Sequence, residues 1–144
     1  MSADLSGFPL LKSLSEEGRE LLGDFLEERS LRDGEMVFSE GDESGELYLV
    51  VEGQVRLEAR GAMVDVIGRG ESFGAGSLVV IGNRECDALC EEPVRLLVLS
   101  RESYVRLRSD HPQLALDLQE AILCELARVV RSVLPGEGSS GLQA

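Results

Sequence analysis

The spacing of hydrophobic residues follows a helical period at both ends of the chain and a shorter period between them. Over residues 8–28, leucines and a phenylalanine recur every three or four positions, which places apolar side chains on one face of a helix. Ser13 and Glu16 have the spacing of a capping box, so we expect the cap at Ser13. The pattern therefore predicts a helical segment over residues 8–28.

Residues 30–99 contain short runs of valine, leucine and tyrosine separated by glycines. In "LYLVVEGQVRLEA", two β-prone runs flank Glu52-Gly53 and the second alternates apolar with polar residues, which predicts a hairpin with one buried face. "ALCEEPVRLLVLS" predicts two more strands around Glu92-Pro93. Short strands separated by glycine turns favour a small jelly-roll barrel over an open parallel sheet.

The helical period returns after Ser100, which can cap a short helix. Pro112 stands in the first turn of a longer helix over 112–134, where its missing N–H costs least. We therefore expect one mainly β domain over residues 1–134, a double-stranded β-helix (jelly roll) with flanking helices at 8–28 and 101–134 and a Gly/Ser-rich, disordered tail at 135–144.

The helix over 112–134 is apolar around a wide arc. One stripe comprises Leu114, Leu118, Ile122, Leu126, Val129 and Val133; a second comprises Leu116, Leu123, Ala127, Val130 and Leu134. A helix packed on a core needs one stripe. Either the barrel covers both stripes, or one packs against the same helix of a second subunit, which predicts a two-fold homodimer.

Charge and composition argue against several functions. The chain of 144 residues has 27 acidic and 14 basic residues, a net charge of -13, and no basic run, so we expect no direct nucleic-acid binding. No stretch approaches 18 apolar residues and the N-terminus lacks the features of a signal peptide, so we expect no membrane span. A single histidine, His111, cannot supply a cupin-type metal site, and we predict neither a metal nor an enzyme.

The three cysteines are Cys86, Cys90 and Cys124. Four residues of strand span roughly 13 Å, too far for a disulfide between Cys86 and Cys90. An iron–sulfur cluster held by four cysteines is excluded, because only three cysteines are present. We therefore expect buried, unreactive thiols in a cytoplasmic protein.

The segment "ESFGAGSLVVIGNRECDA", residues 71–88, has the composition of an anion-binding loop. Gly74 and Gly76 allow close approach of the backbone to an anion, Ser77 adds a hydroxyl, and Arg84 offers a bidentate fork for phosphate. The alternatives are that the glycines only form a tight turn and that Arg84 pairs with one of the many acidic residues.

These motifs, in this order, resemble the cyclic nucleotide-binding domain, the effector domain of cAMP receptor protein-like regulators, kinase regulatory subunits and gated channels. "RDGEMVFSEGDESGELYLVVEGQVRL" is similar to the opening strands of that family, "GESFG" and "REC" to the ends of its phosphate-binding segment, and "LLVLSRESYVRLRSDHPQLALDL" to its closing strand and helices. The resemblance covers about residues 8–134 and implies cAMP or cGMP as the ligand, with no required cofactor. It implies these ligand-binding residues: Phe73, Gly74, Ala75, Gly76, Ser77, Arg84, Glu85 and Cys86.

Two positions depart from the family pattern. A glutamate that contacts the ribose 2′-OH is replaced by Ala75, and the small residue after the arginine by Glu85. Loss of a hydrogen bond to a charged group predicts roughly 10- to 150-fold weaker ribose binding. Glu85 is less damaging, because neighbours on a strand point to opposite faces.

Two functions therefore remain open at this point. The chain is either a sensor, in which a cyclic nucleotide or related phosphate behind residues 73–85 repositions the helix over 112–134, or a degenerate domain that dimerises or docks on a separate effector protein. DNA-binding relatives continue into a helix-turn-helix, whereas residues 135–144 carry no basic side chain. Any effect on transcription would then require another polypeptide.

Overall fold

The computed structural model describes residues 5–43, 45–74, 84 and 86–133. The N-terminal part forms η1 (Pro9–Leu11) and α1 (Glu16–Gly23). The strands are β1 (Glu27–Leu31), β2 (Met36–Phe38), β3 (Leu47–Glu52), β4 (Val55–Ala59), β5 (Ala62–Ile67), β6 (Ser72–Phe73), β7 (Asp87–Cys90) and β8 (Val94–Leu99). Two helices follow, α3 (Arg101–Asp110) and α4 (Pro112–Val133).

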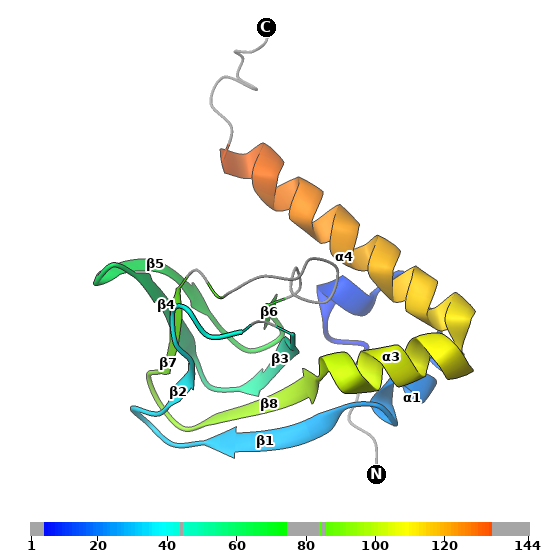
Figure 1. Cartoon of the computed structure of the whole chain (residues 1–144), viewed down its shortest axis with the longest axis horizontal. Helices are drawn as coiled ribbons and strands as arrows, with labels where there is room; N and C mark the ends of the chain where they lie inside the picture. The colour runs from blue at the N-terminus through cyan, green and yellow to red at the C-terminus, as the bar shows by residue number, and fades with distance from the viewer. Residues whose placement is uncertain (1–4, 44, 75–83, 85, 134–144) are drawn as a thin grey trace, which may run out of the picture.

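The strands form two antiparallel four-stranded sheets, in the orders β1-β8-β3-β6 and β2-β7-β4-β5. We call them the first and the second sheet. In Figure 1 the helices lie together at one end of the sheets, and the far end of α4 projects away from the strands. The predicted fold class, mainly β of the jelly-roll type with flanking helices, is confirmed, although the described strands do not join into one closed barrel.

The predicted hairpin around Glu52-Gly53 is wrong. β3 pairs with β8 and β6 in the first sheet, whereas β4 pairs with β5 and β7 in the second. Gly53 has φ 93°, and a side chain there would overlap the carbonyl oxygen of Pro93. Alternation along a strand reveals which face is buried but not which strand lies beside it, so the sequence pattern could not show that the chain changes sheet at Gly53.

The N-terminal helical prediction was too long. The described helices in this region end at Gly23, and Glu27 already begins β1, where it pairs with Val98. The cap is Ser15 rather than Ser13, because the Ser15 hydroxyl accepts a hydrogen bond of 2.9 Å from the Gly18 amide. Pairing with β8 overrides the local helical spacing, a common outcome when tertiary contacts compete with propensity.

The predictions for the C-terminal helices agree with the structure. Ser100 caps α3 by accepting a 3.0 Å hydrogen bond from the Ser103 amide, and Pro112 is the first residue of α4. Two strands also flank Glu92-Pro93, as expected, although β7 and β8 belong to different sheets.

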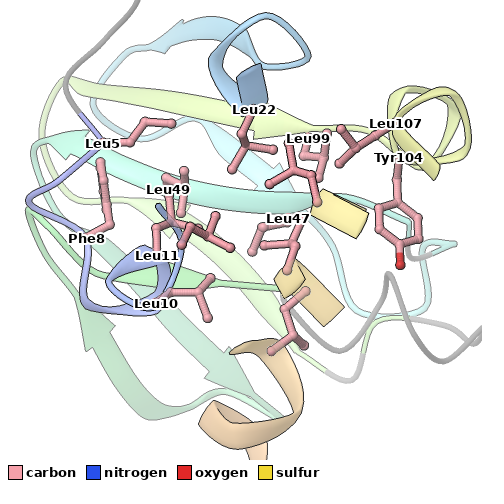
Figure 2. Close-up of a cluster of buried hydrophobic side chains, with 14 of the residues drawn as sticks. Leu5, Phe8, Leu10, Leu11, Leu22, Leu47, Leu49, Leu99, Tyr104 and Leu107 are labelled. Carbon is pink, nitrogen blue, oxygen red and sulfur yellow. The ribbon is translucent and has the colours of Figure 1, made fainter. Parts of the chain in front are cut away.

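Both faces of β3 are buried, and they face two separate cores. Leu47 and Leu49 join the helices in one hydrophobic cluster, shown in Figure 2, while Tyr48 and Val50 face the second sheet in another. This explains the nearly continuous apolar run in "LYLVV". It also directs every second residue from Tyr48 onward into the space between the sheets, where the candidate site begins.

Up to residue 128 of α4, the first apolar stripe packs on the core and the second does not. Leu114, Leu118 and Ile122 are buried, whereas Leu116 and Leu123 are 48% and 53% exposed. The alternative in which the barrel covers both stripes is therefore wrong for the described part of the helix.

The cysteine prediction needs one correction. Cys90 is buried and Cys86 is half-buried, but Cys124 is exposed on α4, so burial does not protect all three thiols. A helical spacing of apolar residues tells which positions face one side of α4, but not how far the core extends along that helix.

Among the described residues, no helix has the length and apolar character needed to cross a membrane.

Candidate ligand-binding site

The backbone of Arg84 is held by the turn at residues 39–42. The Arg84 amide donates to the Asp42 carbonyl at 2.7 Å, and the Arg84 carbonyl accepts from the Gly41 amide at 2.9 Å. The Asp87 carboxylate accepts from the Glu40 amide at 2.6 Å. A turn that follows β2 thus determines where the Arg84 side chain leaves the backbone.

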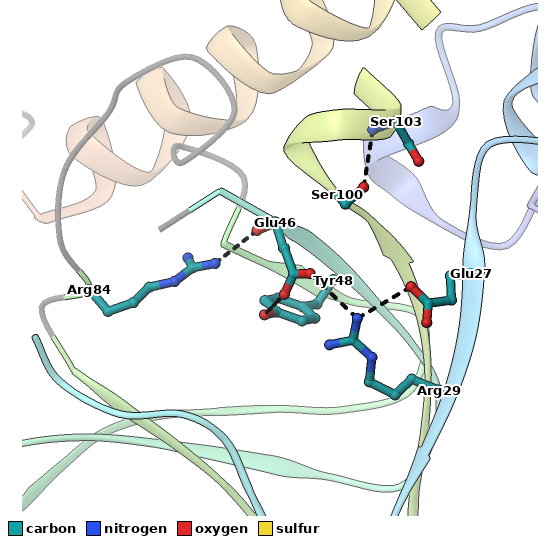
Figure 3. Close-up of polar contacts among 7 residues, drawn as sticks. All are labelled: Glu27, Arg29, Glu46, Tyr48, Arg84, Ser100 and Ser103. Carbon is teal, nitrogen blue, oxygen red and sulfur yellow. Dashed lines mark hydrogen bonds and ion pairs between the residues drawn. The ribbon is translucent and has the colours of Figure 1, made fainter. Parts of the chain in front are cut away.

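The Arg84 guanidinium is turned inward and half-buried. Its Cζ lies 4.2 Å from the centroid of the Phe38 ring and 5.5 Å from that of Tyr48. Its Nη2 donates to the Glu46 carbonyl oxygen at 3.0 Å (Figure 3). These contacts are with rings and a neutral carbonyl, so they leave the positive charge of Arg84 in place.

No carboxylate of the described residues forms an ion pair with Arg84. Its Nε is also buried without a hydrogen-bond partner in that part of the chain. The interpretation of Arg84 as a surface ion pair therefore finds no support there. Among the described residues, Arg84 is therefore a partly buried cation with one donor, Nη2, bonded to a carbonyl and another, Nε, without a partner.

Gly74 borders this guanidinium directly. Its φ is 79°, and a Cβ at this position would lie 2.7 Å from the Glu46 carbonyl oxygen and 3.1 Å from Arg84 Nη1. Both the left-handed backbone and the short distances demand glycine. Arg84 Nη1 therefore lies beside the backbone at the point where the glycine-containing segment begins.

Two aromatic rings, Phe38 and Tyr48, contact the guanidinium, and a third, Phe73, packs against both of them. Tyr48 and Phe73 stack with centroids 4.8 Å apart and planes at 16°, and Phe38 lies 5.8 Å from Tyr48. Tyr48 is 2% and Phe73 6% exposed. Sequence reasoning named Phe73 but missed Phe38 and Tyr48. The available signal was composition, because aromatic residues are only 4% of the chain and three of them gather here.

Glu46 links this cluster to a second arginine. The Tyr48 hydroxyl donates to Glu46 Oε1 at 2.5 Å, and Arg29 Nη2 lies 3.4 Å from Glu46 Oε2. Burial and the hydrogen bond to Glu46 raise the pKa of Tyr48 well above its usual range, so Tyr48 stays a neutral donor. Burial opposes the charge of Arg29, but Glu46 outweighs it and the pKa of Arg29 is raised. The Glu46 carboxylate thus accepts a hydrogen bond from Tyr48 and pairs with Arg29. The Glu46 backbone carbonyl accepts a hydrogen bond from Arg84.

Half of the residues named from the sequence can be placed. Phe73, Gly74, Arg84 and Cys86 lie in the described part of the chain, and Phe73, Gly74 and Arg84 surround the aromatic cluster. The others, Ala75, Gly76, Ser77 and Glu85, lie outside the described residues. Within the described residues, no group of three or more histidine, cysteine or acidic side chains could hold a metal ion.

Comparison with known proteins adds independent information. The family described as "Cyclic nucleotide-binding domain" matches residues 28–111. A cyclic AMP receptor protein of Thermus thermophilus is 34% identical over 119 residues, which cover 79% of this chain and 55% of that protein. A cAMP-dependent protein kinase regulatory subunit of Eremothecium gossypii is 32% identical over 104 residues, covering 72% of this chain and 23% of the relative.

Among solved structures, the N-terminal domain of a transcriptional regulator from Streptomyces coelicolor is similar with a TM-score of 0.78 and 29% identity. The similarity covers 92% of this chain and 99% of that domain. The chain thus corresponds to nearly the whole of one solved domain, but to little more than half of the Thermus protein and about a quarter of the kinase regulatory subunit.

Proposed function

The chain belongs to the cyclic nucleotide-binding domain family, and on this premise we propose that its jelly roll binds cAMP, cGMP or a related phosphate ligand through Arg84. One observation carries the proposal. The half-buried guanidinium lies against Phe38 and beside Gly74, and no described carboxylate neutralises it. In a chain with a net charge of -13, a cation that forms no ion pair with a described carboxylate is suited to an external anion.

The chemistry of arginine supports a phosphate in particular. A guanidinium has five N–H donors in a planar fork that matches phosphate oxygens, and it keeps its charge at any physiological pH. The described structure accounts for one of these donors, through the bond from Nη2 to Glu46. A buried charge is costly unless it is paired, and a phosphate would supply both the counter-charge and the acceptors.

We expect the contribution of the ribose to the binding affinity to be reduced. Position 75 is alanine, which has no side-chain acceptor for a ribose hydroxyl. We therefore expect recognition of the phosphate to contribute most of the affinity, with weak discrimination between nucleosides. The proposed role is regulatory and non-enzymatic, in keeping with the two relatives, a receptor protein and a kinase regulatory subunit.

In the proposed sensor, the ligand acts by repositioning α4. Leu116 and Leu123 expose apolar surface along this helix, which supports a homodimer formed through the second stripe. The same exposed stripe favours the second candidate function, in which the domain dimerises or docks on a separate effector protein without a ligand. We also propose a cytoplasmic location, which the odd number of cysteines, three, favours.

Isothermal titration calorimetry with cAMP and cGMP tests the sensor. Wild-type protein should release or absorb heat on titration with up to millimolar nucleotide, and Arg84→Ala should abolish the signal. Arg32→Ala is the matched control, because the Arg32 side chain is 90% exposed and should leave binding unchanged. If wild type and Arg84→Ala bind the nucleotide with the same affinity, Arg84 is refuted as the residue that binds the phosphate. Absence of binding by folded wild type would instead favour the interaction module.

A further inference from the structure

The Arg84 guanidinium contacts aromatic rings from both sheets. Phe38 ends β2 in the second sheet, and Tyr48 lies on β3 in the first. The distances from the guanidinium carbon to the two ring centroids, 4.2 Å and 5.5 Å, are both within the roughly 6 Å range of cation–π attraction. The position of the positive charge therefore depends on the packing of one sheet against the other.

The two rings are themselves restrained. Tyr48 stacks on Phe73 and its hydroxyl donates to Glu46, while Phe38 lies within 6.1 Å of Phe73, centroid to centroid. The residue that accepts the Tyr48 hydroxyl also accepts Arg84 Nη2 through its backbone carbonyl. Figure 3 shows Glu46 bonded to both Arg84 and Tyr48. The rings thus restrain the guanidinium carbon, and the Glu46 carbonyl restrains Nη2.

The other terminal nitrogen of the guanidinium, Nη1, approaches Gly74. A Cβ at Gly74 would lie 3.1 Å from Arg84 Nη1, so this nitrogen points to the start of the glycine-containing segment. An unrestrained arginine side chain loses rotamer freedom when it binds an anion, whereas a side chain that is already oriented does not lose it at that step.

We propose that Phe38 and Tyr48 are positioning residues that orient Arg84 for the phosphate group of the ligand. This inference rests on the proposed function for its ligand, but the orientation itself exists without one. Neither residue is part of the glycine–arginine motif, and a purely structural role would predict that any apolar side chain of similar size can replace Phe38. A positioning role requires an aromatic ring at that place.

Two substitutions of Phe38 separate these roles. Phe38→Leu keeps an apolar side chain but removes the ring, and Phe38→Tyr keeps the ring. We expect Phe38→Leu to weaken binding of cAMP by about 2- to 30-fold, the range that corresponds to one cation–π contact, and Phe38→Tyr to restore it. Leu31→Ala is the control for stability, because Leu31 packs on the same hydrophobic cluster and has no contact with Arg84 among those found.

A second measurement needs no ligand. In the proton–nitrogen NMR spectrum of the unliganded protein, ring currents should move the Arg84 Hε signal upfield, and Phe38→Leu should return it toward the value of an exposed arginine. Phe38→Tyr should keep the upfield position and Leu31→Ala should not change it.

The outcomes distinguish the two proposals. If wild type does not bind cAMP or cGMP but the Arg84 signal responds to Phe38→Leu, the proposed function fails and the orientation of Arg84 stands. If the Arg84 signal is the same in wild type and Phe38→Leu, or if folded Phe38→Leu binds cAMP as tightly as wild type, the positioning role is overturned.

Discussion

Gly74→Ala tests the geometry of the site most directly, because the chain contains a closely matched control. Gly74 and Gly61 both have φ 79°. At Gly61 a new Cβ would have no heavy atom within 4 Å, whereas at Gly74 it would lie 2.7 Å from the Glu46 carbonyl oxygen and 3.1 Å from Arg84 Nη1. The two alanine variants therefore share the backbone strain and differ in steric crowding.

The expected free energies follow from these two terms. A left-handed conformation costs an L-residue roughly 1–2 kcal/mol, offset by about 0.4–1 kcal/mol because alanine restricts the unfolded chain more than glycine does. Gly61→Ala should therefore lower the free energy of unfolding by about 0–1.6 kcal/mol. Overpacking adds about 1–3 kcal/mol, so Gly74→Ala should lower it by about 1–5 kcal/mol.

Urea denaturation followed by far-UV circular dichroism measures both variants. The midpoints should separate while the slope of the transition stays constant, which shows that stability changed without a change in the compactness of the denatured state. Arg84→Ala should not rescue Gly74→Ala, because the nearest obstacle is the backbone oxygen of Glu46. Equal losses of stability in Gly74→Ala and Gly61→Ala would refute the close approach of Glu46 and Arg84 to position 74.

Other variants test the remaining parts of the structure. Ile122→Ala should lower the free energy of unfolding by about 2–5 kcal/mol, because Ile122 is 0% exposed, whereas Leu116→Ala, at 48% exposure, should stay within about 0.5 kcal/mol in the monomer; equal effects in urea titrations would contradict the assignment of the two stripes. If the second stripe forms the proposed dimer, Leu123→Glu should give a monomer in analytical ultracentrifugation while the exposed control Glu120→Ala remains dimeric. The pKa of Tyr48 is raised by burial and by Glu46, so its contribution to stability is complete below about pH 10 and is lost as the pH rises through the folded-state pKa. Thermal melts from pH 9 to 12 should therefore show a smaller alkaline loss in Tyr48→Phe than in wild type, and identical profiles would argue against a buried, hydrogen-bonded phenol.

Local signals predicted the parts of the fold that depend on local contacts. Ser100 and Pro112 mark the starts of α3 and α4, because a capping hydroxyl and a missing N–H act within one helical turn. The same logic failed at Ser13, where Ser15 two residues later caps α1 instead. Among the site residues, Gly74 and Arg84 were identifiable from their motif. Phe38 and Tyr48 were not, because they meet Arg84 only when β2 and β3 are brought together.

By itself, the sequence determined the family, the mainly β class, the two C-terminal helices and the presence of an arginine after a glycine-rich segment. These properties follow from residue types and short-range spacing. Only the tertiary structure decided that β3 and β4 belong to different sheets, that β1 replaces the end of the predicted helix, and that Arg84 lies on aromatic rings rather than beside a described acid. Each of these depends on contacts between residues far apart in the chain, and no local period or motif specifies which distant surface a strand or a charge will meet.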